Sequence, residues 1–337
     1  MERSATPERR RRGAGLVGMR EVARLAGVST QTVSRVLNQS PSLRPETRER
    51  VLAAIAELDY RPNNAARSLG TATTRTLGVV ATDATLHGPS LAIAELAGAA
   101  HATGRWVSTA YADAEDDESV RRAAAHLLGQ GVDAVILVAP HVRTRTTLEA
   151  LAPGVPLVVM HGGEPDRQAE ATALLVDHLV GLGHSRIARL GGPHDWLEEA
   201  SRGRGFADAL GRHRARPGPQ WVGDWSARSG AAVADDVAAA VGRPGGPTAI
   251  VVANDQMALG LVAALETTGV RVPHDLSVVG FDDNPDAAYY RPALTTVRID
   301  LRGEARRCVA VAYADAETPR PAPPVLVSRD STMPPPR

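Results

Sequence analysis

From Thr76 onward the sequence alternates short apolar runs with helix-length segments, and this alternation constrains the fold more than any other feature. Runs of roughly four to eight apolar residues separated by helices predict a parallel β-sheet that is covered on both faces. The region spans about 260 residues, which is more than one doubly wound sheet needs. We therefore expect two α/β lobes of similar structure with a cleft between them at the carboxyl ends of the strands. The runs are TLGVVAT, RWVSTAYA, DAVILVA, VPLVVMH, SRIARLGG, PTAIVVA and LSVVGF.

The last part of the chain contains a helical segment, LRGEARRCVAVAYADAE, and then PAPPVLVSRDSTMPPPR, which predicts a final strand and a proline-rich end. The only cysteine, Cys308, lies in that helical segment, so the chain has no internal disulfide. We expect Cys308 to be a small packing side chain of the helix rather than a reactive thiol.

Three helical patterns occupy about 45 residues near the N-terminus, with a turn at Gly27 between the first two. Pro45 suits the first turn of the third helix, and Glu46 lies near its positive end. Arg44 would be a poor N-cap, so we expect it to serve something other than helix stability. The apolar faces are predicted at Val22, Leu25 and Ala26, at Val33, Val36 and Leu37, and at Val51, Ile55 and Leu58.

The second of these helices carries hydroxyls, a carboxamide and a guanidinium away from its apolar face. A helix, a glycine turn and a second helix form an arrangement that lays the second helix in the major groove of DNA. There Gln31 suits adenine, Arg35 suits guanine, and Thr30 can use its hydroxyl or its methyl group. The alternative is a solvated face of a small helical unit. Residues suited to phosphate contacts are Ser29, Ser34, Asn38 and Thr47.

The charge distribution supports a polyanionic partner for this end of the chain. The net charge is zero, but residues 1–75 hold 14 Arg against 7 acidic residues. The Arg9–Arg12 run is predicted to be either a solvated tail or a source of nonspecific, salt-sensitive attraction to phosphates.

After Arg61-Pro62, the segment NNAARSLG is too short to hold a helix in isolation, because nucleation is costly and nothing in it supplies packing. Asn63 or Asn64 could cap a helix there, and Leu69 is its only large apolar side chain. We predict a linker that orders against a partner. An exposed Leu on such a segment suits a wedge between DNA base pairs, and the alternative is that Leu69 docks on the core.

Polar residues follow several of the apolar runs, where the cleft is expected. Carboxylate, amide and guanidinium groups bracket sugar hydroxyls, and an aromatic face packs against C–H groups, so this set suits a sugar. A surface ion pair with Glu198 or Glu199 is the alternative for Arg202, and a core position is the alternative for Trp225. The candidates are Asp83, His87, Ser90, His161, Arg202, Trp225, Asn254, Asp255, Asp282 and Asp283.

Several classes of protein are disfavoured. No apolar run approaches a membrane span, and the basic N-terminus lacks the apolar region of an export signal, so we expect a cytoplasmic protein. Walker, dinucleotide-binding and G-x-S-x-G motifs are absent, and His178 and His184 are badly spaced for metal binding. We therefore expect no enzyme activity, no metal and no cofactor.

REVARLAGVSTQTVSRVLNQ, followed by TRERVLAAIAELDYRPNNAARSL, resembles the head of the lactose-repressor (LacI/GalR) family of bacterial transcription regulators. The similarity continues to about residue 332, and HGPS, VGDWSARSG, PTAIVVANDQMALG and DLSVVGFDDNP are most similar to the lactose-repressor branch. The resemblance implies an N-terminal all-α helix-turn-helix headpiece and an α/β two-lobed domain like the periplasmic sugar-binding proteins, with doubly wound parallel sheets.

On this basis we divide the chain into five parts. They are a basic disordered tail at 1–17, a helix-turn-helix DNA-binding headpiece at 18–62, a hinge helix and linker at 63–75, a two-lobed effector-binding and dimerisation domain at 76–332, and a disordered end at 333–337. In the family, paired hinge helices of a dimer enter the minor groove. That role carries over to Leu69 as the wedge, with Asn63 and Ala66 beside the backbone.

The resemblance also assigns effector contacts. Arg202, Asn254 and Asp282 lie where the family grips sugar hydroxyls, and Trp225 lies where an aromatic packs on the sugar ring. Val138, His161 and Ile299 replace polar ligand groups of the lactose-repressor branch, and Leu301 replaces an aromatic. His161 could donate a hydrogen bond to a hydroxyl, carry positive charge toward an anionic ligand, or be a structural residue at a strand end.

The sequence thus predicts a homodimeric transcriptional regulator that binds palindromic operator DNA. We expect a repressor of carbohydrate-utilisation genes that is released by a small sugar, with galactosides as one candidate. The chain ends STMPPPR where lactose repressors carry tetramer-forming leucine heptads, so a dimer is expected. The alternatives are a sugar sensor without DNA-directed regulation and a regulator that responds to a non-sugar or anionic ligand.

Overall fold

The structure is a computed structural model that describes residues 17–37, 43–60, 73–151, 154–163 and 166–336. The chain forms two compact units, residues 1–74 and residues 75–337. Each unit is a separate body with its own apolar core, so we describe each by itself.

The first unit contains the three predicted helices, α1 (Met19–Ala26), α2 (Thr30–Leu37) and α3 (Pro45–Glu57). Gly27 ends α1 in the left-handed conformation at φ 64°, which a residue with a Cβ adopts only with strain. Arg44 occupies the N-cap of α3 and makes no side-chain cap bond, as expected. The core of the unit comprises Val22, Ala23, Ala26, Val33, Val36, Val51, Ala54 and Tyr60.

The prediction that Leu25 belongs to the buried face of α1 is wrong. Leu25 is 45% exposed, whereas Ala23 is buried. Met19, Val22, Ala23 and Ala26 follow the i, i+3, i+4, i+7 spacing of one helix face; the last three are buried in the core, and the partly buried Met19 packs against it. The sequence interpretation extended the buried face from Val22 toward Leu25, whereas the structure extends it toward Ala23.

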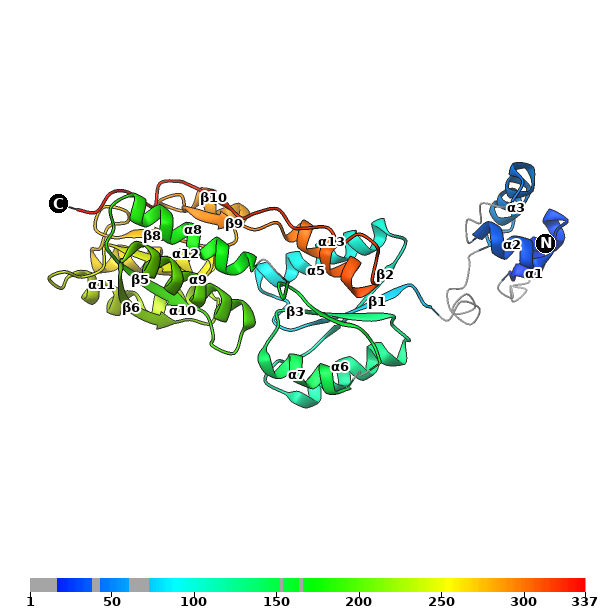
Figure 1. Ribbon diagram of the computed structural model, residues 1–337, viewed down its shortest axis with the longest axis horizontal. Coiled ribbons are helices and arrows are strands. Elements are labelled where there is room, and N and C mark those ends of the chain that lie inside the picture. The colour runs from blue at the N-terminus through cyan, green and yellow to red at the C-terminus, as the bar shows by residue number, and fades with distance from the viewer. Residues whose placement is uncertain (1–16, 38–42, 61–72, 152–153, 164–165, 337) are drawn as a thin grey trace, which may run out of the picture. The chain divides into compact units, whose positions relative to one another are not determined.

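The second unit consists of two α/β lobes. The N-terminal lobe has a parallel sheet in the order β2-β1-β3-β4. Helices α5 and α13 pack on one face of this sheet, and α6 and α7 pack on the other (Figure 1). The strands are β1 (Thr76–Ala81), β2 (Trp106–Tyr111), β3 (Ala134–Val138) and β4 (Leu157–Val159). The helices are α5 (His87–Ala102), α6 (Asp117–Gly129), α7 (Val142–Leu151) and α13 (Leu301–Ala312).

The C-terminal lobe repeats this arrangement with a parallel sheet in the order β6-β5-β7-β8. Helices α8 and α9 cover one face and α10, α11 and α12 cover the other. The strands are β5 (Arg186–Gly191), β6 (Arg216–Val222), β7 (Ala249–Val252) and β8 (Ser277–Val279). The helices are α8 (Arg167–Gly181), α9 (Leu197–His213), α10 (Ala227–Ala232), α11 (Ala234–Val241) and α12 (Asp255–Thr268). The 3₁₀ helix η1 (Pro285–Tyr289) and the antiparallel pair β9 (Thr296–Arg298) and β10 (Val325–Val327) complete it.

The predicted fold class is confirmed: each of the seven apolar runs contains a strand, and the two sheets have the same strand order. Strand β6 was missed, because its sequence RPGPQWV has no apolar run. It lies at the edge of its sheet, where Pro217 and Pro219 are tolerated because one side of the strand needs no ladder bonds.

The chain passes between the lobes after β4, after β9 and after α13. Helix α13 follows β9 in sequence but packs against α5, β3 and β4 of the N-terminal lobe. Cys308 of this helix is fully buried, and burial raises the pKa of its thiol. A packing role therefore fits Cys308 better than a reactive one.

The end of the chain differs from the expectation of disorder over 333–337. The Met333 carbonyl lies 3.0 Å from His184 Nε2 and accepts a hydrogen bond from the Ser277 hydroxyl at 3.0 Å. Its N–H donates to the same hydroxyl at 3.1 Å. Hydrogen bonds to the C-terminal lobe therefore hold this segment at Met333. Within the described residues, no helix is long and apolar enough to cross a membrane.

Candidate functional site

Two places in the molecule gather the predicted functional side chains. The first is the outward face of α2, where Thr30, Gln31 and Arg35 are exposed and Ser34 is half-buried. Val33 and Val36 of the same helix are buried in the core. The helix therefore presents Gln31, Ser34 and Arg35 together on the side away from the core, at i, i+3 and i+4.

Ser29 has a structural task that sequence reasoning did not assign. Its hydroxyl oxygen accepts the Thr32 N–H at 3.1 Å and lies 3.0 Å from the Thr32 hydroxyl, so it caps the first turn of α2. Thr47, another predicted phosphate contact, is half-buried on α3. The remaining predicted DNA contacts, Asn38, Asn63, Ala66 and Leu69, lie outside the described residues.

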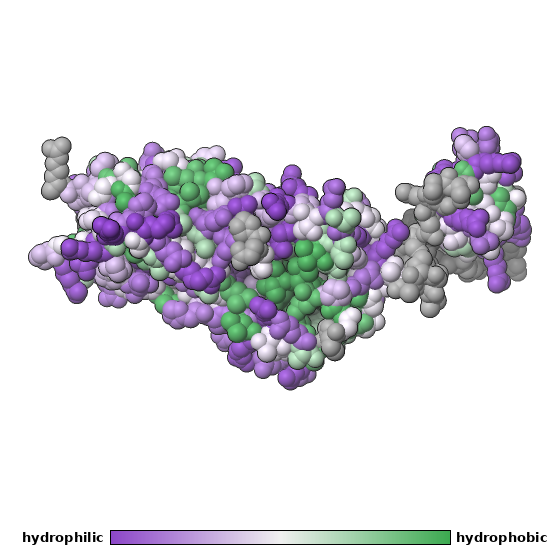
Figure 2. Space-filling view, viewed as in Figure 1, coloured by the Kyte–Doolittle hydropathy of each residue, from purple (hydrophilic) through white to green (hydrophobic). Residues whose placement is uncertain are grey.

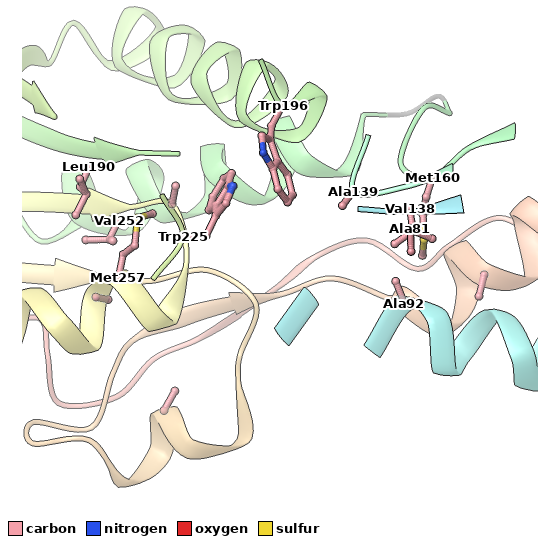
Figure 3. Packing of buried hydrophobic residues seen from close by; sticks show 14 of the residues in the cluster. Ala81, Ala92, Val138, Ala139, Met160, Leu190, Trp196, Trp225, Val252 and Met257 are labelled. Carbon is pink, nitrogen blue, oxygen red and sulfur yellow. The ribbon is translucent and has the colours of Figure 1, made fainter. Parts of the chain in front are cut away.

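The second place is a cavity between the two lobes of the second unit. It encloses about 720 Å³ of space, part of which is open to solvent. The part of this space that a water-sized group can occupy is about 60 Å³, which is smaller than the roughly 300–1,000 Å³ typical of small-molecule pockets. In Figure 3, Trp196 and Trp225 face Val138, Ala139, Met160 and Ala92 across the region between the lobes. Its lining is Leu86, His87, Gly88, Pro89, Ala92, Val138, Ala139, Met160, His161, Gln168, Trp196, Glu198, Arg202, Trp225, Asn254, Gln256, Asp282, Ile299 and Leu301.

Several lining residues occur where a strand ends and the backbone turns sharply. Ala139, His161, Trp225 and Asp282 all have positive φ values, at 54°, 61°, 71° and 109°. Non-glycine residues adopt this conformation at a cost, and such positions cluster at binding sites. The strand ends of both lobes therefore form the cavity in the way that the sequence predicts.

Arg202 is the central cation of the cavity. Its Nε donates to Gln168 Oε1 at 2.8 Å, and its Nη1 donates to the Ala253 carbonyl. The guanidinium also stacks 3.7 Å from the centre of the Phe281 ring. Its Nη2 lies 3.7 Å from Asp282 Oδ1, so the two side chains form an ion pair. The alternative of a surface ion pair for Arg202 is wrong, because the side chain is buried.

Asp282 and Glu198 are the acidic members of the lining. Burial raises the pKa of Asp282, while the positive charge of Arg202 opposes that rise. Burial raises the pKa of Glu198 to about 7, and Asp282 adds to the rise. Within the described part of the chain, Glu198 Oε2 is buried without a hydrogen-bond partner. Glu199, the other partner considered for Arg202, instead forms a buried ion pair with Arg189 at 2.6 Å.

His161 lines the cavity as a neutral side chain. Burial lowers its pKa to about 4, although Glu304 favours the charged form. The backbone N–H of His161 donates to Glu304 Oε1 at 2.7 Å. The lowered pKa favours the neutral ring near neutral pH, and a neutral ring can form a hydrogen bond with a ligand hydroxyl. A positive charge toward an anionic ligand stays an alternative prediction.

Trp225 and Trp196 form an aromatic wall, with ring centroids 5.1 Å apart. A Cβ on Gly192 would lie 2.1 Å from the Trp225 ring, so glycine there lets the ring lie directly on the backbone. Trp225 Nε1 is buried without a partner among the described residues. Trp225 is thus both core and lining, and Trp196 is a lining residue that the sequence interpretation missed.

Asn254 joins two elements of the site. Its Nδ2 donates to the Trp225 carbonyl at 3.0 Å, and its Oδ1 accepts the Met257 N–H at 2.8 Å as the N-cap of α12. It lines the cavity as predicted. The amide retains one donor hydrogen and one acceptor lone pair for a ligand.

Four candidates are not in the lining. Ser90 is exposed, and its hydroxyl donates to the Ala84 carbonyl at 2.6 Å. Asp283 pairs with Arg298 and Arg329. Asp255 accepts the Thr296 hydroxyl and the Asn284 N–H, both at 2.7 Å. Asp83 binds His141 instead.

His87, in contrast, lines the cavity. Val138, Ile299 and Leu301, the positions that differ from the lactose-repressor branch, line it too.

His141 connects the two lobes beside the cavity. Its Nε2 lies 3.1 Å from Asp83 Oδ2 of the N-terminal lobe, and its Nδ1 lies 2.7 Å from Asp195 Oδ2 of the C-terminal lobe. Burial lowers its pKa, but the two carboxylates outweigh burial and raise it overall. Both ring nitrogens must carry protons to donate to both carboxylates, so this geometry favours the imidazolium form. The ring also packs 4.8 Å from Trp196, between centroids.

The missed lining residues, Gln168, Trp196, Glu198 and Gln256, carry weak sequence signals. Glu198 lies four residues before Arg202, a spacing that also occurs on exposed helix faces, and Gln168 follows no apolar strand. Among the residues that the structure describes, no group of three or more His, Cys, Asp and Glu side chains is arranged to hold a metal ion.

A family model and the curated relatives that match this chain point to bacterial regulatory proteins. Residues 18–63 match the bacterial regulatory proteins of the lacI family, and residues 176–332 match the periplasmic binding protein-like domain. The chain is 37% identical over 294 residues to the lactose operon repressor of Escherichia coli strain K12, covering 85% of this chain and 81% of the repressor.

Two solved structures are similar to this chain over most of its length. One is the Lac repressor dimer bound to operator and the anti-inducer ONPF, with a TM-score of 0.79, 34% identity and coverage of 95% of this chain and 100% of that chain. The other is a complex of the transcriptional regulator CelR with cellobiose, with a TM-score of 0.63, 28% identity and coverage of 94% and 99%. The matched proteins are regulators that join a DNA-binding headpiece to a ligand-binding domain.

Proposed function

The chain is a member of the lacI family of bacterial regulatory proteins, and from that premise we propose that it is a transcriptional repressor that a small sugar releases from its operator. As a family member it combines a helix-turn-helix unit with a two-lobed domain that takes a small-molecule effector. The proposal concerns the identity of the effector class, the contact residues and the assembly.

The outward face of α2 supports the DNA half of the proposal. Gln31 and Arg35 are exposed on the side away from the core, where they can meet base edges in the major groove. Thr30 and Ser34 flank them on the same helix. The hydroxyls of Ser29, Ser34 and Thr47 are the proposed phosphate contacts. For Asn38, Asn63, Ala66 and Leu69, the support comes from the family resemblance alone.

The grouping of Arg202, Asp282, Asn254 and Trp225 around one cavity carries the sugar half of the proposal. A guanidinium and a carboxylate 3.7 Å apart bracket neighbouring hydroxyls, and an aromatic wall packs against sugar C–H groups. His87 and His161 can add hydrogen bonds from the other side. Because His161 is neutral, the lining lacks the extra cation that an anionic effector would need.

We propose a homodimer, as palindromic operators require. The outward side of α5 carries Leu91, Ala94, Ala97 and Gly98, all exposed. Figure 2 shows apolar surface gathered on the N-terminal lobe around α5. An apolar face of this kind suits burial against a second copy. Ser90 lies at the start of the same helix and outside the cavity, so we no longer assign it an effector contact.

The sugar would act by preferring one arrangement of the two lobes, because ligand binding shifts an equilibrium only by its difference in affinity between states. In a dimer that preference changes the spacing of the two headpieces. A repressor acts where the DNA is, so the proposal includes a cytoplasmic location. Catalysis has no part in it.

The test is selection of DNA from a randomised duplex library by the purified full chain. We expect enrichment of a two-fold symmetric site, and release of that site by one neutral sugar from a panel of hexoses and disaccharides. Gln31→Ala and Arg35→Lys should each reduce affinity for the selected site about 5- to 150-fold, as expected for a lost bidentate base contact. Arg35→Lys keeps the charge and should retain salt-dependent nonspecific binding. Enrichment of no symmetric site would contradict the repressor, and a pure sugar sensor would then remain.

A further inference from the structure

Glu198 of α9 is a cavity residue with one carboxyl oxygen, Oε2, that has no hydrogen-bond partner within the described residues. The side chain lines the cavity and the residue is only 8% exposed. The Oε2 atom itself is buried. Leaving a buried polar atom unpaired costs free energy, so such an atom at a cavity wall points to a ligand group that completes it.

Within the described residues no cation forms a hydrogen bond with Glu198 Oε2, although the positive charges of Arg202 and His141 lie near enough to oppose the rise of its pKa. Arg202, four residues along the same helix, already donates to Gln168 and to the Ala253 carbonyl and pairs with Asp282. The adjacent Glu199 is paired with Arg189. The described lining thus holds two carboxyl groups, Glu198 and Asp282, against one guanidinium that is already engaged.

This balance of charges decides which ligands the cavity can take. A phosphate or carboxylate on the ligand would lie next to two buried carboxyl groups, and its repulsion with their ionised forms is only weakly screened. A hydroxyl or an ammonium group would instead donate a hydrogen bond to the unpaired oxygen. Polar groups that have no partner in the absence of ligand give a site strong discrimination between ligands.

We propose that Glu198 determines the effector class: its carboxyl group accepts a hydrogen bond from a hydroxyl or ammonium group of an uncharged or cationic sugar and excludes phosphorylated and carboxylated sugars. This inference rests on the proposed function only in taking the cavity as the effector site.

The protonation of Glu198 adds a pH signature. Burial is the main cause that raises its pKa to about 7; Asp282 contributes to the rise, and a backbone hydrogen bond, Arg202 and His141 oppose it. His161, also in the lining, stays neutral because its pKa is lowered to about 4, and His87 is the other titratable side chain of the wall. Ionisation of Glu198 as the pH rises through 7 therefore increases the attraction for an ammonium group.

The experiment measures binding of matched hexoses to the full chain by tryptophan fluorescence, since Trp196 and Trp225 line the cavity. The probes are glucose, galactose and mannose, each as the free hexose, the 2-amino sugar and the 6-phosphate. The variants are Glu198→Gln, which keeps the shape and removes the charge, and Glu198→Ala, which serves if the first is poorly folded. Glu266→Gln, at an exposed position on α12, is the control for loss of one negative charge.

We expect the wild-type chain and Glu266→Gln to bind at least one hexose or amino sugar about tenfold or more tighter than its 6-phosphate. Glu198→Gln should shrink this ratio about tenfold. A tighter amino sugar whose advantage grows between pH 5.5 and pH 7, where its amine stays protonated, and disappears in Glu198→Gln identifies an ammonium donor. Equal affinities for hexose and amino sugar identify a hydroxyl donor.

The inference is overturned if a 6-phosphate binds as tightly as its parent hexose, if Glu198→Gln leaves the ratio unchanged, or if no hexose binds in any form. These results are separate from the DNA selection. A chain that enriches a symmetric site but fails to exclude phosphates keeps its repressor role and loses only the inference about Glu198. A chain that excludes phosphates but selects no DNA keeps the inference about Glu198 and loses the repressor role.

Discussion

The two lobes contribute different chemistry to the same cavity. The C-terminal lobe supplies the hydrogen-bonding and charged groups, with Gln168, Glu198, Arg202, Asn254 and Asp282 in one wall. The N-terminal lobe supplies mainly apolar side chains, which are Leu86, Pro89, Ala92, Val138 and Ala139, together with His87. The lobes have the same strand order, so the difference is one of side chains rather than of topology.

The comparison indicates that the two lobes have different roles in ligand binding. Hydrogen bonds are directional, and in the C-terminal wall they hold Arg202 against Gln168 and Asn254 against the Trp225 carbonyl. Apolar contact is not directional, so an apolar wall can close on a ligand without a precise register. We infer that the C-terminal lobe sets which ligand binds and the N-terminal lobe sets how firmly the cavity closes.

The largest expected effect comes from breaking the polar wall. Arg202→Met leaves Asp282 buried without its cation, so affinity for the effector should fall by at least about 2 kcal/mol, as for other truncated buried charge pairs. Fluorescence titration measures the loss. Arg204→Met is the matched control, because the Arg204 side chain on the same helix is 61% exposed and pairs with Asp166 outside the cavity. Similar losses in both variants would contradict a special role for Arg202.

A change in the apolar wall should act differently. Val138→Ala removes two methyl groups from a residue that is 1% exposed, so the free energy of unfolding should fall by about 2 kcal/mol. Affinities for different sugars should fall by a common factor, which leaves their order unchanged. Denaturant unfolding and titration with several sugars measure the two effects. A reordering of sugar preference would show that the N-terminal lobe also selects the ligand.

The contact between the lobes should show a pH dependence. The folded-state pKa of His141 is raised, so its stabilising contribution is fully present below the unfolded-state value of about 6.5 and is lost as the pH rises through the folded value. Relative to wild type, His141→Gln should therefore lose most stability at pH 6 and least at pH 9. Comparing the two unfolding profiles cancels the titration of groups that do not interact with His141. Parallel profiles would mean that His141 is not protonated in this bridge.

The smallest effect is expected at Ser90. Ser90→Ala removes a hydrogen bond to the Ala84 carbonyl at an exposed position, so stability should change by no more than about 1.5 kcal/mol. Affinity for the effector should stay the same. A large loss of affinity would return Ser90 to the site and would move the boundary of the cavity on its N-terminal side.

The sequence by itself determined the fold class and much of the polar wall. Short apolar runs such as DAVILVA are local signals, and their spacing is enough to predict parallel sheets in two lobes. Trp225, Asn254 and Asp282 follow strand ends, where ligand groups lie in this architecture. The family resemblance then singled them out together with Arg202, which lies within α9. The face of α2 was found in the same way, because Val33 and Val36 define which side of the helix is outward.

Only the tertiary structure decided what depends on contacts between distant segments. Strand β6 has no apolar run, and its place at the sheet edge follows from pairing with β5. The bridge at His141 needs Asp83 and Asp195, which lie more than 50 residues away on either side. The charge states of His161 and Glu198 follow from burial by elements remote in sequence. Local pattern specifies secondary structure, whereas burial and charge depend on which segments meet in space, and for those contacts this sequence carries no local signal.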